Sequence, residues 1–112
     1  MAELKITDIE LGDGKTAVKG ALITTHYRGC LADGTQFDSS YDKGQAFQCV
    51  IGTGRVIKGW DQGIIGMKVG GKRKLEVPAE LAYGERQIGD KIPPNSDLSF
   101  EIELLEVLTR DD

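Results

Sequence analysis

A regular alternation of apolar and polar residues near the C-terminus constrains the fold of this chain more than any other feature. Every second residue from 98 to 104 is leucine, phenylalanine or isoleucine, and the residues between them are serine or glutamate. Alternate side chains of a β-strand point to opposite faces, so this segment is expected to be a strand with one face on a core. Weaker patterns predict four further strands, over residues 4–11, 21–31, 47–51 and 72–77. The alternation slips once in the first of these, which indicates a β-bulge.

Glycine usage and one helical pattern complete the predicted architecture. Fifteen glycines among 112 residues indicate many tight turns, because glycine reaches positive φ without strain. The only helical spacing of apolar residues lies between positions 56 and 67. Gly59 and Gly63 fall inside it and weaken a helix, so packing has to hold it in place. We therefore expect an α+β domain, in which an antiparallel sheet of about five strands carries one short helix across its apolar face.

Length and charge limit the functions open to the chain. At 112 residues we expect a single domain, spanning 1–112. Lysine and arginine total 14 against 18 acidic residues, which gives a net charge of −4. This balance disfavours general binding to nucleic acid or to an anionic membrane, because affinity for phosphate depends on basic side chains. No secretory signal and no apolar run of membrane-spanning length are visible, so a cytoplasmic protein is expected, most simply a monomer.

Metal and cofactor sites are poorly supported. Cys30 and Cys49 are interpreted as free thiols, because a chain without an export signal is expected in a reducing compartment. A zinc site needs about four ligands, and the chain has only one histidine beside these two cysteines. The spacing of residues 66–72 matches a phosphate-binding loop, but Arg73 follows where that motif needs serine or threonine. A turn is the preferred interpretation. We expect no metal and no cofactor.

Covalent and acid–base catalysis are also disfavoured. His26 has no recognisable nucleophile near it in the sequence, so a structural role is preferred. Asp38 and Asp42 lie close in sequence, but nothing around them indicates the apolar setting that would push two carboxyl pKa values apart. The seven aromatic residues are spread over all the predicted elements, and any one of them alone is best interpreted as core.

Six short motifs nevertheless occur in one order along the chain, and together they resemble the FK506-binding protein family of peptidyl-prolyl isomerases. The motifs are HYRG (26–29), DGTQFDSS (33–40), VIKGWD (56–61), AYG (82–84), IPP (92–94) and LSFEIELL (98–105). Each is weak alone, but their collinear spacing is specific. The resemblance implies a half-barrel, with a twisted antiparallel sheet wrapped around a short helix and an apolar pocket between them.

The resemblance also implies a set of site residues, which includes every aromatic except Tyr41. Three residues are assigned to catalysis: Asp38 at the rim, Tyr83 with its hydroxyl directed at a bound carbonyl, and Phe100 in the wall. Seven are assigned to substrate binding: Tyr27, Phe37, Phe47, Val56, Ile57, Trp60 as the floor, and Ile92 on a flap. The backbone amide of Ile57 is expected to meet a second carbonyl. For Asp38, a contact with substrate and a role in tying down its own loop are both left open.

The implied activity is cis–trans isomerisation of X–Pro bonds in proline-containing polypeptides, with macrolides such as FK506 or rapamycin as further ligands. Rotation breaks no bond, so it needs neither a nucleophile nor a metal. The expected mechanism is desolvation and positioning in the aromatic pocket. The alternative is a non-catalytic module that binds proline segments or a macrolide. A purely structural domain is the weakest interpretation.

Three residues depart from the family's pattern. Lys43 stands where arginine is common and cannot form the same bidentate fork with a carboxylate. Cys49 replaces a common aromatic residue, and Lys91 replaces an apolar residue of the flap. We expect these changes to affect macrolide affinity more than isomerase activity.

Overall fold

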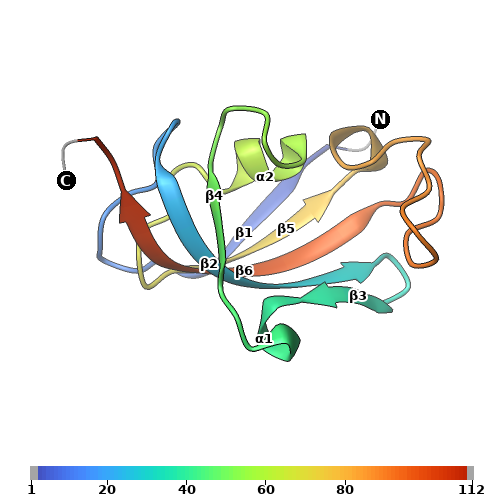
Figure 1. Ribbon diagram of the computed structural model, residues 1–112, viewed down its shortest axis with the longest axis horizontal. Coiled ribbons are helices and arrows are strands. Elements are labelled where there is room, and N and C mark those ends of the chain that lie inside the picture. The colour runs from blue at the N-terminus through green and yellow to red at the C-terminus, as the bar shows by residue number, and fades with distance from the viewer. Residues whose placement is uncertain (1–2, 111–112) are drawn as a thin grey trace.

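The computed structural model describes residues 3–110, which form a six-stranded sheet accompanied by short helices (Figure 1). The strands are β1 (Lys5–Glu10), β2 (Leu22–Leu31), β3 (Gln36–Ser39), β4 (Phe47–Val50), β5 (Lys72–Val77) and β6 (Leu98–Leu108). The helical segments are α1 (Ser40–Lys43), α2 (Lys58–Gly63) and the 3-10 turn η1 (Ala79–Leu81). All strand pairs are antiparallel, in the order β1-β5-β6-β2-β3, with β4 also paired to β2. The predicted α+β class is confirmed.

The sheet has one strand more than the five that the sequence patterns indicated. The additional strand is β3, which pairs with β2 through Arg28 opposite Ser39 and Gly29 opposite Asp38. The segment Gln36–Ser39 contains one apolar residue and shows no alternation, and it is a strand because it pairs with β2. This pairing has a functional consequence, because it sets Phe37 and Asp38 beside β2.

The two longest strands, β2 and β6, form the centre of the sheet. They pair from Leu22 opposite Leu108 to Leu31 opposite Leu98, with one register shift between Thr24 and Thr25. The predicted alternation of β6 is confirmed, because every second residue from 98 to 104 is buried. The predicted bulge of β1 is also present, as a register shift between residues 8 and 10 in its pairing with β5.

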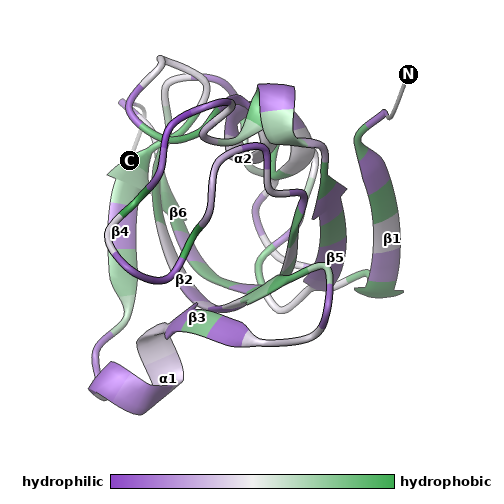
Figure 2. Cartoon of the chain, turned by 90° about the vertical axis from the view of Figure 1, so that its right-hand side faces the viewer, coloured by the Kyte–Doolittle hydropathy of each residue, from purple (hydrophilic) through white to green (hydrophobic). Residues whose placement is uncertain are grey.

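Helix α2 is shorter than the predicted segment 56–67 and lies across the sheet (Figures 1 and 2). Ile57, with ψ at 150°, is extended and precedes the first turn. The two glycines of this helix allow it to lie close against β5. A Cβ atom on Gly59 would stand 2.5 Å from Val77 Cγ1, and one on Gly63 would stand 2.7 Å from Leu75 Cδ2. Their cost in helix propensity is therefore offset by a close approach that a larger residue would prevent.

The core fills the space between α2 and the sheet and contains the apolar face of β6 together with Ile23, Trp60, Ile64 and Leu75. Between η1 and β6, residues 82–97 form an irregular excursion that is closed by a single bridge between Ile88 and Ile92. Within residues 3–110, no helix has the length and apolar character needed to cross a bilayer.

Candidate active site

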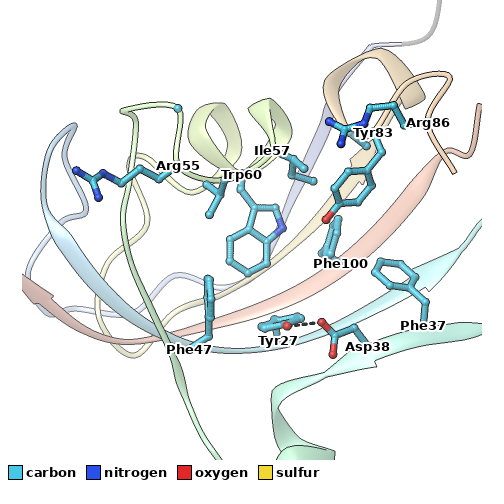
Figure 3. Close-up of a pocket in the computed structure, with 13 residues that line it drawn as sticks. Tyr27, Phe37, Asp38, Phe47, Arg55, Ile57, Trp60, Tyr83, Arg86 and Phe100 are labelled. Atoms are coloured by element: carbon cyan, nitrogen blue, oxygen red, sulfur yellow. Dashed lines mark hydrogen bonds between the residues drawn. The ribbon is translucent and has the colours of Figure 1, made fainter. Parts of the chain in front are cut away.

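A cavity of about 430 Å³ opens between α2 and the sheet. Six of its lining residues are aromatic, and Figure 3 shows their rings around one common space. Each ring is supplied by a different segment of the chain: Tyr27 by β2, Phe37 by β3, Phe47 by β4, Trp60 by α2, Tyr83 by the excursion after η1, and Phe100 by β6. Tyr41, the seventh aromatic residue, does not line this cavity. The fold therefore brings the six predicted aromatic residues together around one cavity.

Trp60 is the centre of the aromatic group. Three rings meet its indole nearly at right angles, with centroid distances of 5.1 Å to Tyr27, 5.8 Å to Phe47 and 5.5 Å to Phe100. Phe37 continues the wall through an edge contact of 5.7 Å with Phe100. Edge-to-face pairs are the favoured arrangement of aromatic rings, so the wall is held in a defined shape before any ligand arrives. Trp60 itself is buried, with 4% of its surface exposed.

Asp38 is the only acidic residue of the cavity lining, and its carboxylate is already engaged within the chain. It accepts hydrogen bonds from the Tyr27 hydroxyl at 2.5 Å and from the backbone N–H of Ser39 at 2.9 Å. Lys43 Nζ lies 2.9 Å from Asp38 Oδ1. Partial burial would raise the pKa of Asp38, but the hydrogen bonds from Tyr27 and Lys43 outweigh it and hold that pKa below its usual value. The carboxylate thus ties its own loop to Tyr27.

Lysine at position 43 still pairs with Asp38, although it lacks the planar fork of arginine. Its side chain is 62% exposed, so the pair adds little stability by itself. Tyr27 is the better-protected partner of Asp38. Burial, followed by the hydrogen bond to Asp38, raises the pKa of Tyr27 far above its usual value. The Tyr27 hydroxyl therefore stays protonated and acts as a donor.

Several hydrogen-bond donors at the cavity have no partner among residues 3–110, and buried Trp60 Nε1 is one of them. The Tyr83 hydroxyl points into the cavity in Figure 3 and makes no hydrogen bond within this part of the chain. The backbone N–H of Ile57 is likewise unused there. Burial, with a smaller contribution from the charge of Asp38, raises the pKa of Tyr83, so this hydroxyl also keeps its proton. The cavity therefore combines an apolar wall with donors available to carbonyl groups.

The loop between β4 and α2 is held by Asp61, a residue of α2 itself. The Asp61 carboxylate accepts the backbone N–H of Gly52 at 2.8 Å and that of Gly54 at 2.9 Å. This loop carries Val56 and Ile57 into the cavity lining. One carboxylate on the short helix thus fixes the position of the segment that provides the Ile57 amide.

Nine of the ten predicted site residues line the cavity, and Ile92 does not. Ile92 is buried, with 4% of its surface exposed, and exchanges backbone hydrogen bonds of 2.9 and 3.2 Å with Ile88. The structure thus places its side chain in the core, and contact with a substrate stays a prediction. His26 lies on the opposite face of β2 from Tyr27, where its ring stacks on Tyr41 at 4.7 Å and contacts Ser40 Oγ at 2.9 Å.

Sequence reasoning missed four residues of the lining: Gly54, Arg55, Ala82 and Arg86. Ala82 precedes Tyr83 and Arg55 precedes Val56, so proximity in the chain to a predicted site residue was a usable signal for both. Arg86 lies in a loop without periodic pattern, and no local feature distinguishes it from other exposed basic residues. Within residues 3–110, no three histidine, cysteine or acidic side chains are placed to hold a metal ion together.

A sheet curved around a short helix, with an aromatic cavity and unpaired donors between them, defines a site for a compact apolar segment bearing carbonyl groups. A family model described as FKBP-type peptidyl-prolyl cis-trans isomerase matches residues 13–105. The chain belongs to this family, and its enzymatic class is peptidyl-prolyl cis-trans isomerase. The aromatic cavity is therefore the candidate active site.

Relatives and solved structures agree with this assignment. The chain is 55% identical to an FK506-binding protein of Neisseria meningitidis serogroup A, over 96% of this chain and 98% of the relative. It is 53% identical to FK506-binding protein 1 of Saccharomyces cerevisiae, over 93% and 92%. The crystal structure of AtFKBP13 superposes with a TM-score of 0.87 at 48% identity, covering 94% of this chain and 93% of that one. FkpA from Escherichia coli gives a TM-score of 0.84 at 41% identity, covering 93% of this chain and 47% of FkpA.

Proposed function

We propose that this isomerase accelerates rotation about X–Pro bonds by desolvating the bond in its aromatic cavity and by positioning the carbonyl groups beside it. The uncatalysed barrier of about 18–20 kcal/mol comes from amide resonance. Resonance makes the planar amide more polar than the twisted transition state, so water stabilises the ground state more. An apolar wall removes that preference and lowers the barrier. The observation that carries the proposal is the convergence of six rings, centred on buried Trp60.

Positioning is assigned to two of the unused donors. The Tyr83 hydroxyl and the Ile57 N–H are free to bind carbonyl oxygens of the substrate, and both groups border the cavity. Hydrogen bonds that fit the twisted peptide better than the planar one lower the activation free energy. Asp38 acts in this proposal by holding Tyr27 and its own loop. Phe100, in edge contact with both Trp60 and Phe37, shapes the wall that receives the proline.

A pair of variants at Phe47 tests the desolvation mechanism. Phe47 is 38% exposed, so its replacement leaves less of the core disturbed than replacement of a buried ring would. Leucine and glutamine are similar in size but differ in polarity, so Phe47→Leu is the matched control for Phe47→Gln. We expect kcat for a Leu-Pro peptide, measured by NMR exchange without a coupling protease, to fall further in Phe47→Gln.

Equal kcat values in two folded Phe47 variants would contradict the desolvation mechanism. A wild-type rate no faster than buffer would contradict the proposed function as a whole. Urea unfolding of both variants provides the necessary check on folding.

Binding of FK506 or a related macrolide in the same cavity is part of the proposal. The support comes from the relatives, which are named FK506-binding proteins, and from the apolar cavity with its free donors. Trp60 is the only tryptophan of the chain, so its fluorescence reports directly on the base of the cavity. Saturable quenching by FK506, lost on competition with a proline peptide, is the expected result.

We further propose that residues 1–112 act as a single isomerase domain and as a cytoplasmic monomer. The two cysteines are free, as suits a reducing compartment. The net charge of −4 supports proline-containing polypeptides, rather than nucleic acid or anionic membranes, as partners. Sedimentation at micromolar concentration tests the monomeric state. Cell fractionation tests the cytoplasmic location.

A further inference from the structure

Two arginines stand at the cavity, and the isomerisation mechanism does not use either of them. Arg55 is carried by the loop between β4 and α2, and Arg86 by the excursion between η1 and β6. Figure 3 shows them on opposite sides of the ring group, with Arg55 extending beyond Phe47 and the Arg86 guanidinium above Tyr83. Both are exposed. Both side chains therefore border the space that the residues next to a bound proline would enter.

Neither guanidinium is engaged within the part of the chain that the structure describes. No side-chain hydrogen bond or ion pair joins Arg55 or Arg86 to another residue of 3–110, and the one hydrogen bond of Arg86 runs from its backbone N–H to the carbonyl oxygen of Tyr83 at 3.1 Å. This contrasts with Arg73, which binds Asp8 at 2.7 Å and the carbonyl oxygen of Gly63 at 2.8 Å. The cavity arginines are therefore available to an incoming ligand, whereas Arg73 has a structural role.

The charge at the cavity is opposite in sign to that of the whole chain. Asp38 is the one acidic residue of the lining, and its charge is matched by Lys43 at 2.9 Å. Arg55 and Arg86 have no such counter-charge in the lining. The overall charge of −4 acts over longer distances, and salt screens it beyond about 8–10 Å. Among the charged groups of the lining, the two guanidinium groups are therefore the ones left without a counter-charge.

We propose that Arg55 and Arg86 select proline segments that carry carboxylates within a few residues of the X–Pro bond. Arginine suits this role because its planar fork binds a carboxylate through two parallel hydrogen bonds. The inference rests on the proposed function, since it requires the proline to occupy the aromatic cavity. The arginines act here as specificity determinants outside the rotating bond. Their effect falls on KM rather than on kcat, because charge attraction is the same for the planar and the twisted peptide.

The expected selectivity follows from the strength of exposed ion pairs. One such pair changes an equilibrium constant by about 1.4-fold to fivefold. With two arginines available, we expect kcat/KM for an acidic peptide to exceed that for a neutral one by about twofold to 25-fold at low ionic strength. A basic peptide is expected to fall below the neutral one. Salt at about 0.5 M should remove most of the difference, because the Debye length then shrinks to a few ångströms.

Three blocked peptides test the inference. They share the neutral core Ala-Leu-Pro-Phe-Ala and differ only in two residues on each side, which are glutamate, glutamine or lysine. NMR exchange gives kcat/KM for each at low and high salt. Acceleration of the glutamine peptide tests the proposed function alone, and the ratio of glutamate to glutamine peptide tests the inference. A ratio of one in an enzyme that accelerates the glutamine peptide would overturn the inference and leave the proposed function intact.

Variants assign the selectivity to the two side chains. In the double variant Arg55→Gln/Arg86→Gln the ratio is expected to fall close to one, and Arg55→Lys/Arg86→Lys should restore much of it. Lys5→Gln, on the exposed edge strand β1, is the control for loss of positive charge, and it should keep the wild-type ratio. Persistence of selectivity in the double glutamine variant, or its equal loss in Lys5→Gln, would overturn the inference.

Discussion

Replacing Tyr83 by phenylalanine separates positioning from the rest of the site, because it removes one oxygen atom and leaves the ring in the cavity wall. The hydroxyl makes no hydrogen bond with any residue of 3–110, so the native state loses no interaction there. We expect the free energy of unfolding to change by less than about 0.5 kcal/mol. Activity is expected to fall, because the substrate loses a donor.

The size of the loss follows from the net value of a neutral hydrogen bond. That value is about 0.5–1.5 kcal/mol, which corresponds to a loss of about twofold to tenfold in kcat/KM for Tyr83→Phe. If the bond is stronger for the twisted peptide, as we propose, the loss appears in kcat. NMR exchange on a Leu-Pro peptide, over a range of peptide concentrations, separates kcat from KM.

Tyr41→Phe provides the matched control for this experiment. The Tyr41 hydroxyl donates to Glu103 at 3.1 Å, outside the cavity lining, so its removal should leave both kinetic constants unchanged. The reasoning is refuted if Tyr83→Phe retains wild-type kcat and KM, or if Tyr41→Phe loses as much activity. An increase in KM at constant kcat would show that Tyr83 binds planar and twisted peptide equally.

Three further predictions concern stability. The pKa of Asp38 is lower in the folded protein than in the unfolded chain. The stabilisation from its carboxylate is therefore complete above the unfolded pKa of about 3.9 and is lost as pH falls through the folded value. Urea titrations should show that the free energy of unfolding decreases less at acid pH in Asp38→Asn than in the wild type. The pKa of Tyr27 is raised by folding, so stability declines as pH rises above about 10, and Tyr27→Phe should flatten this alkaline decline. Gly59→Ala places a Cβ atom 2.5 Å from Val77 Cγ1; overpacking of about 1–3 kcal/mol exceeds the gain in helix propensity of about 1 kcal/mol, so thermal unfolding should occur at a lower temperature, and an unchanged midpoint would contradict this.

The assignment of Asp38 illustrates how far sequence reasoning reaches at the site. Its position at the rim was predicted, but the alternatives of substrate contact and loop support stayed open. The structure provides three donors to this carboxylate, from Tyr27, Ser39 and Lys43. These contacts depend on the pairing of β3 with β2 and on the turn α1, and neither element has a periodic pattern in the sequence. The role within the chain thus became visible only with the tertiary structure.

The sequence by itself determined five of the six strands, the α+β class and, through six collinear motifs, the family and most residues of the cavity. Periodicity indicates which side chains share a face of a strand or helix, and this local property can be read from the sequence alone. The tertiary structure decided the short extent of α2, the burial of Ile92 away from the cavity and the placement of Arg55 and Arg86 at it. These features depend on which loops the sheet brings together. The distances between loops are set by the folded structure and cannot be read from the sequence.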